Sequence, residues 1–92
     1  MYKRQTKTEQ EQKSKKQISN SYSLVLYNDD VNTFDHVINC LIRICQHDVV
    51  QAEQCAWLVH NRGKCNIKSG KLTILRKMQN ALTQNGLSAE IE

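Results

Sequence analysis

The segment LVLYNDDVNTFDHV, residues 24–37, contains the transition that decides the fold. Its first four residues are apolar or aromatic and of the types that favour a strand. This pattern stops at Asn28, Asp29 and Asp30, and an amphipathic helical pattern begins a few residues later. An amide and two adjacent carboxylates therefore occupy the turn between a strand and a helix.

The residues after this turn predict a pair of helices. One apolar stripe recurs at the helical period and consists of Phe34, Val37, Ile38, Leu41, Ile42 and Cys45. Asn32 is the expected N-cap of this helix, with Asp35 completing a capping box. Asp48 and Gln51 predict a similar start for a second helix, and Gly63 predicts its end. Because only two residues separate the first stripe from Asp48, the two helices must turn tightly against each other.

The rest of the chain completes an α+β pattern. Strands are expected at residues 21–27, 64–68 and 87–92, and a third helix is expected from Leu72 to about Gly86. The order β-α-α-β-α-β predicts a three-stranded antiparallel sheet with three helices packed on one face. In the first strand, Leu24 and Leu26 should share one face.

Length and composition limit the chain to one modest domain. It has 92 residues, of which 39% are hydrophobic. Residues 1–20 are almost wholly Lys, Gln, Glu, Ser and Thr, and cannot bury enough apolar surface to offset their chain entropy. We therefore expect a disordered N-terminal arm at 1–20 and a domain at 21–92. Neither a membrane span nor a signal peptide is recognisable, which predicts a cytoplasmic protein without a membrane partner.

The positive charge is confined to the arm. Residues 1–17 carry six basic and two acidic residues, which accounts for the whole net charge of +4. The remaining residues carry seven of each and are neutral. A nucleic-acid-binding hypothesis would rest on the arm alone, so we expect no nucleic-acid partner for the domain.

The cysteines predict neither a metal site nor catalysis. No C-x-x-C pair occurs among Cys40, Cys45, Cys55 and Cys65, and all four lie within periodic apolar patterns. An enzyme would need one of these thiols paired with His36, His47 or His60, and none of these histidines has a recognisable catalytic context. The sequence therefore predicts a non-catalytic protein with no cofactor and with reduced, buried thiols.

One group of residues suggests a binding site. If the first two helices pack antiparallel, His60 in the last turn of the second helix returns to the turn that contains Asn28 and Asp29. Apolar positions such as Phe34 and Val37 would lie beside these polar groups. An apolar recess with acceptors around its mouth suits a cationic amine that carries a hydrophobic side chain. The free N-terminus of a peptide is such a group.

These residues resemble the ClpS-type adaptors, which present proteins with destabilising N-terminal residues to a Clp AAA+ unfoldase and its protease. The resemblance covers about residues 22–92 and rests on LYNDD (26–30), TFDHVINCL (33–41), VHNRGK (59–64) and the spacing between them. It implies a monomeric adaptor that binds protein N-termini beginning with Leu, Phe, Tyr or Trp. Delivery would be to a ClpA-like or ClpC-like unfoldase, with the arm required for handing over the substrate.

The resemblance also implies roles for particular residues. Asn28, Asp29 and His60 would hold the substrate's α-amino group and first peptide unit, and Asp30 would support that cluster. Asn32 lies where the family often has Thr, which can bond the peptide backbone. The pocket for the first side chain would be lined by Phe34, Val37, Leu41 and Ala56.

Four positions depart from the family pattern. Phe34 and Ala56 stand where many members have Met, which leaves the preferred subset of Leu, Phe, Tyr and Trp open. Thr73 and Met78 stand where Glu and Lys are usual in the helix that touches the unfoldase. A ribosome-associated module is a further alternative, because the C-terminal domain of the ribosomal stalk protein resembles this fold. That alternative gives the turn and His60 no purpose.

Overall fold

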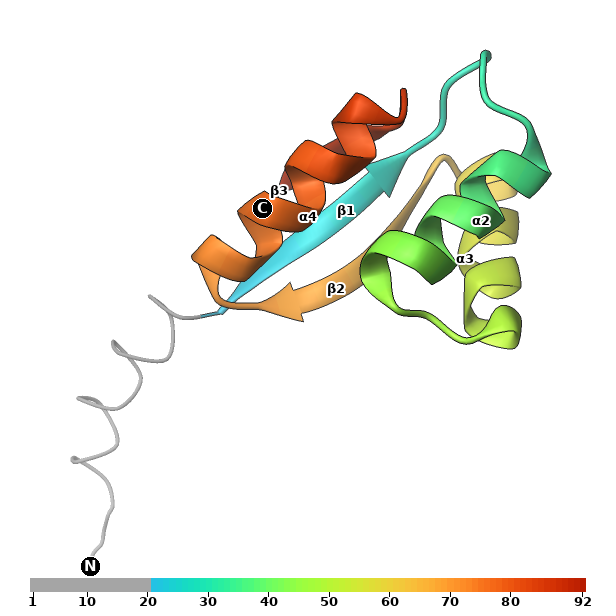
Figure 1. The fold of residues 1–92 in the computed structure, drawn as a ribbon. Coiled ribbons are helices and arrows are strands. Elements are labelled where there is room, and N and C mark those ends of the chain that lie inside the picture. Colours follow the sequence, from blue (N-terminus) through green and yellow to red (C-terminus); the bar gives the residue numbers. More distant parts are fainter. Residues whose placement is uncertain (1–20) are drawn as a thin grey trace, which may run out of the picture.

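The computed structural model describes residues 21–92, and the expected arm at 1–20 lies outside the described residues. The elements follow the predicted order (Figure 1). They are β1 (Tyr22–Tyr27), α2 (Phe34–Cys45), α3 (Val49–Arg62), β2 (Lys64–Gly70), α4 (Leu72–Gln84) and β3 (Ser88–Ile91). The α+β class and the element order predicted from the sequence are confirmed. Within 21–92, no helix has both the length and the apolar character needed to cross a bilayer.

The sheet has β1 at its centre, in the order β2-β1-β3, with both pairings antiparallel. Leu26 pairs with Cys65 on one side and with Ala89 on the other. These three side chains are buried in the same core, so one face of the sheet packs against the helices. Leu24 lies on that face as well, as its alternation with Val25 predicted.

The three helices contribute to a single core on this face. Its largest fully buried side chains include Leu24 and Leu26 from β1, Leu41 from α2, and Leu75 and Leu82 from α4. From α3 the core takes the small side chains Ala52, Cys55 and Val59. Small residues on α3 let this helix approach α2 and β2 closely. The prediction of three helices on one face is therefore confirmed.

A β-bulge in β2 anchors the connection between α2 and α3. Leu24 pairs with Lys68 but Val25 pairs with Asn66, so Ile67 is the extra residue. Its carbonyl oxygen lies 2.8 Å from Nε2 of the buried His47. The ammonium group of Lys68 lies 3.4 Å from the carbonyl oxygen of Cys45. These contacts fix the corner of the α2–α3 pair over β2.

The caps agree with the sequence at α3 and differ at α2. Asp48 caps α3 by accepting a hydrogen bond from the backbone N–H of Gln51, and Gly63 ends that helix in the left-handed conformation. The predicted cap Asn32 is wrong for α2, because Thr33 holds the extended N-cap position and accepts from the backbone N–H of His36. Asn32 has other partners, which are described below.

The end of α3 returns to the turn after β1, as expected for two helices packed back against each other. The backbone N–H of Asn28 donates to the carbonyl oxygen of Gly63 at 2.9 Å. This bond joins the first residue of the turn to the C-cap of α3. The turn, the start of α2 and the end of α3 therefore meet at one end of the domain.

Candidate functional site

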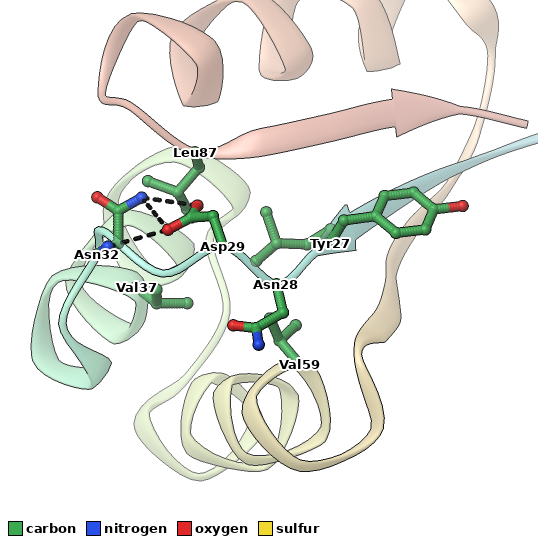
Figure 2. A pocket seen from close by; sticks show the side chains of 8 residues that line it. Tyr27, Asn28, Asp29, Asn32, Val37, Val59 and Leu87 are labelled. Carbon is green, nitrogen blue, oxygen red and sulfur yellow. Dashed lines mark hydrogen bonds between the residues drawn. The ribbon is translucent and has the colours of Figure 1, made fainter.

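The carboxylate of Asp29 organises the turn after β1. Its Oδ1 accepts from the backbone N–H groups of Val31 and Asn32, both at 2.9 Å, and from Nδ2 of Asn32 at 3.1 Å. Among residues 21–92, its Oδ2 accepts only from Nδ2 of Asn32, at 2.8 Å (Figure 2). This is the local bonding that favours Asp in turns. One carboxylate oxygen is thus fully engaged within the turn, while the other retains accepting capacity.

Asn32 and His36 tie the turn and the start of α2 to the segment between α4 and β3. Nδ2 of Asn32 donates to the carbonyl oxygen of Gly86 at 2.8 Å. Nε2 of His36 lies 2.9 Å from the carbonyl oxygen of Asn85. Because a carbonyl oxygen only accepts, Nε2 of His36 must carry the proton in this bond.

A small hollow opens at this junction. It has a volume of about 20 Å³, which is room for about one water molecule. Its lining comes from β1, the turn, α2, α3 and the segment before β3 (Figure 2). The lining residues are Leu26, Tyr27, Asn28, Asp29, Asn32, Val37, Val59 and Leu87. Polar acceptors from the turn and apolar walls from the helices therefore share one small space.

Four of the residues proposed from the sequence line this hollow: Asn28, Asp29, Asn32 and Val37. Asp30 is exposed and does not line it. His60 is also exposed and follows Val59, which contributes to the hollow from α3. The side chains of Asn28 and His60 make no hydrogen bond to any other residue of the described part of the chain.

The remaining predicted pocket residues lie away from the hollow. Leu41 and Ala56 are buried, with exposed fractions of 0% and 2%, and Ala56 lies outside the main core cluster. Phe34 is 42% exposed and lines a broad surface depression of about 460 Å³. The depression also takes in Glu53 and Trp57, which flank Ala56 on α3.

Four lining residues were not proposed for the site from the sequence: Leu26, Tyr27, Val59 and Leu87. Leu26 and Tyr27 lie at the end of β1, directly before the turn. Val59 directly precedes His60, so its position could have been read from the helical period of α3. Leu87 belongs to a segment distant in the sequence, which the pairing of β3 with β1 brings to the hollow. Its signal was the left-handed glycine before it, because Gly86 has φ of 86° and turns the chain toward β3.

The turn keeps Asp29 charged. Donation from the backbone N–H of Asn32 is the main cause that lowers the pKa of Asp29 below its usual value of 3.8. Bonds from the Val31 backbone and the Asn32 side chain, and the nearby His36, lower the pKa further, while partial burial opposes them. The hollow therefore presents a negative charge at neutral pH.

The cysteines have the properties of structural residues. All four are free and buried. Burial raises the pKa of Cys45 to about 11 and that of Cys55 to about 12. Sγ of Cys40 lies 3.6 Å from Nε2 of His36, yet burial raises the pKa of this thiol as well. A thiolate nucleophile is therefore disfavoured at Cys40, Cys45 and Cys55 at neutral pH. No group of side chains suited to a metal ion occurs within residues 21–92.

The bonding of Asp29 gives a testable pH dependence. Its depressed pKa means that its contribution to stability is present above about pH 4 and is lost as the pH falls through the lower folded-state value. A carbon-detected NMR titration should give a midpoint for the Asp29 carboxyl below 3.8. Asn32→Ala should raise this midpoint. Asn39→Ala, which removes only a bond to Arg43, should leave it unchanged. A wild-type midpoint at or above 3.8 would contradict the described turn.

Comparison with known proteins identifies the family. The sequence model for ClpS, described as ATP-dependent Clp protease adaptor protein ClpS, matches residues 17–90. Among solved structures, the chain is similar to Agrobacterium tumefaciens ClpS2 bound to L-phenylalaninamide. The TM-score is 0.70 and the identity 16%, over 80% of this chain and 96% of that one. No curated protein matches the sequence. The structural likeness supports the fold, and the family match over most of the chain shows that this protein belongs to the ClpS family of ATP-dependent Clp protease adaptors.

Proposed function

We propose that this protein binds the free N-terminus of proteins that begin with a bulky hydrophobic residue, Leu, Phe, Tyr or Trp, and delivers them to a Clp AAA+ unfoldase. The observation that carries the proposal is the Asp29 carboxylate, which lines an apolar hollow and keeps Oδ2 only partly engaged. The ligand of the similar ClpS2 structure, L-phenylalaninamide, combines an α-amino group with an aromatic side chain. The same pair of chemical groups suits the hollow described here.

The α-amino group is assigned to the polar side of the hollow. Oδ2 of Asp29 supplies a charged acceptor, and the side chain of Asn28 supplies an amide oxygen with no partner among the described residues. His60 supplies an imidazole nitrogen from the adjacent end of α3. An α-ammonium carries charged N–H donors that can satisfy several such acceptors, whereas an internal peptide bond offers a single neutral one. An unpaired buried acceptor costs about 1–3 kcal/mol, so an internal segment should bind at least about tenfold more weakly.

The first side chain is assigned to the space between α2 and α3. At about 20 Å³ the hollow is too small for it, so binding must enlarge the hollow. Phe34 lines the surface next to the stretch of α3 that contains the buried Ala56. Rotation of the half-exposed Phe34 would extend the space from Val37 toward the surface and toward Ala56. Leu41, buried beneath, would then form its floor.

Delivery is assigned to parts of the chain outside the hollow. The basic arm at residues 1–20 would engage the unfoldase together with the substrate. In α4, Thr73 is exposed and Met78 is partly buried. Neither can supply the charge that Glu and Lys would provide at these positions. The partner would be a ClpA-like or ClpC-like unfoldase. The protein itself performs no chemical step.

His60 allows a clean test of N-terminus binding, because it makes no hydrogen bond within the described domain. His60→Ala should weaken the Kd for a Leu-initiated peptide with a free amine by about tenfold, through loss of a hydrogen bond to a charged group. Fluorescence anisotropy with a dye at the peptide's C-terminus measures this. Asn61→Ala is the matched control, because Asn61 bonds only the carbonyl oxygen of Trp57. Equal Kd values for His60→Ala and the wild type would remove His60 from the site.

Truncation of residues 1–17 separates binding from delivery. The truncated protein should bind the same peptide with the wild-type Kd, because the hollow is formed by residues of the domain. It should fail to promote degradation of a Leu-initiated reporter by a reconstituted Clp unfoldase and protease. Undiminished degradation would show that the arm has no part in delivery.

A further inference from the structure

We propose that Asn32 and His36 are positioning residues that hold Leu87 in the wall of the hollow, and thereby set which first residues the site accepts. The inference rests on the proposed function, because it concerns the selectivity of the same site. It assigns to Asn32 a role different from contact with the peptide backbone. It also gives a role to His36, which the proposed binding of the substrate N-terminus does not use.

The amide of Asn32 is already committed inside the protein. Its Nδ2 faces two kinds of acceptor, the Asp29 carboxylate and the carbonyl oxygen of Gly86. Since neither group can donate, the amide nitrogen must face them, and its two hydrogens are both used. Asn32 therefore links the charged group of the site directly to the segment before β3.

His36 makes a second link to the same segment, one residue earlier. Its Nε2–H donates to the carbonyl oxygen of Asn85 from the first turn of α2. Asn32 in the turn and His36 in α2 thus donate hydrogen bonds to the carbonyl groups of two consecutive residues. Two hydrogen bonds to adjacent peptide units fix both the position and the orientation of that backbone more strictly than one bond does.

These two hydrogen bonds hold the backbone directly before Leu87. Leu87 follows Gly86 directly, is 4% exposed, and lines the hollow opposite elements contributed by α2 and α3. After Leu87 the chain enters β3, where Ser88 pairs with Tyr27. A Cβ on Gly86 would lie 3.6 Å from Oδ1 of Asn32, which shows how closely the two segments approach. Outward movement of the backbone at Leu87 would lengthen the bonds to Asn85 and Gly86.

Holding Leu87 in place limits the width of the substrate's first side chain. With Leu87 held in place, the hollow can enlarge only toward Phe34 and Ala56. The space gained there suits a branched aliphatic side chain such as Leu. A wide indole needs the Leu87 wall to retreat as well. We therefore expect the wild type to favour Leu over Trp as first residue, and release of the two bonds to reduce that preference.

The test compares two peptides that differ only in a first residue of Leu or Trp, both with a free amine. The measured quantity is the ratio of the two Kd values, Trp over Leu. His36→Leu removes the donor to Asn85 and should lower this ratio by at least about threefold, as expected for the net effect of one hydrogen bond. His36→Gln restores an N–H donor at similar reach and should retain the wild-type ratio. Asn32→Ala should also lower the ratio, and it provides a second test if His36→Leu does not fold.

Gln79→Leu is the control for a general loss of packing. Gln79 makes a comparable bond from α4 to the carbonyl oxygen of Ala89, but does not line the hollow. Its variant should retain the wild-type ratio. An unchanged ratio in folded His36→Leu and Asn32→Ala proteins that still bind the Leu peptide would overturn the positioning role alone. A wild type that binds neither peptide would overturn the proposed function, and the inference with it.

Discussion

The Asp29 carboxylate is the constraint on which the rest of the site depends. By accepting two backbone N–H groups it fixes the turn that follows β1, and through Asn32 it connects this turn to Gly86. Here Oδ2 keeps accepting capacity and lies at a hollow with apolar walls. The same group can therefore build the site and serve as its charged acceptor.

Three separate parts of the chain must meet at this carboxylate for the site to exist. The bond between Asn28 and Gly63 brings the end of α3, the bonds to Asn85 and Gly86 bring the segment before β3, and Thr33 starts α2 beside them. The bulge of β2, which receives His47, holds the opposite end of the helix pair. The rigid part of the domain thus fixes the polar half of the site. In the proposed function, enlargement for a first side chain would come from movement of Phe34, while Leu87 stays in place.

Sequence patterns predicted those parts of the structure that depend on local chemistry. The shared core face of Leu24 and Leu26 in β1, the Asp48 cap and the Gly63 stop all follow from neighbours in the chain, and all are observed. Asn32 and Thr33 are both good N-caps, and their competition was decided by Asp29 and Gly86, which the helical pattern does not contain. Leu87 was missed for the same reason, because its place at the hollow follows from strand pairing. The small volume of the hollow depends on side-chain packing, which a periodic sequence pattern does not specify.

The most direct test of N-terminus recognition is isothermal titration with a Leu-initiated peptide and with the same peptide acetylated at its α-amino group. Acetylation removes the charge and leaves one neutral N–H, while the side chain and the rest of the peptide stay the same. Recognition by Asp29 predicts that the acetylated peptide binds at least about tenfold more weakly, from the loss of a charge-assisted hydrogen bond. Equal affinity for the two peptides would contradict the assignment of the hollow as a site for protein N-termini.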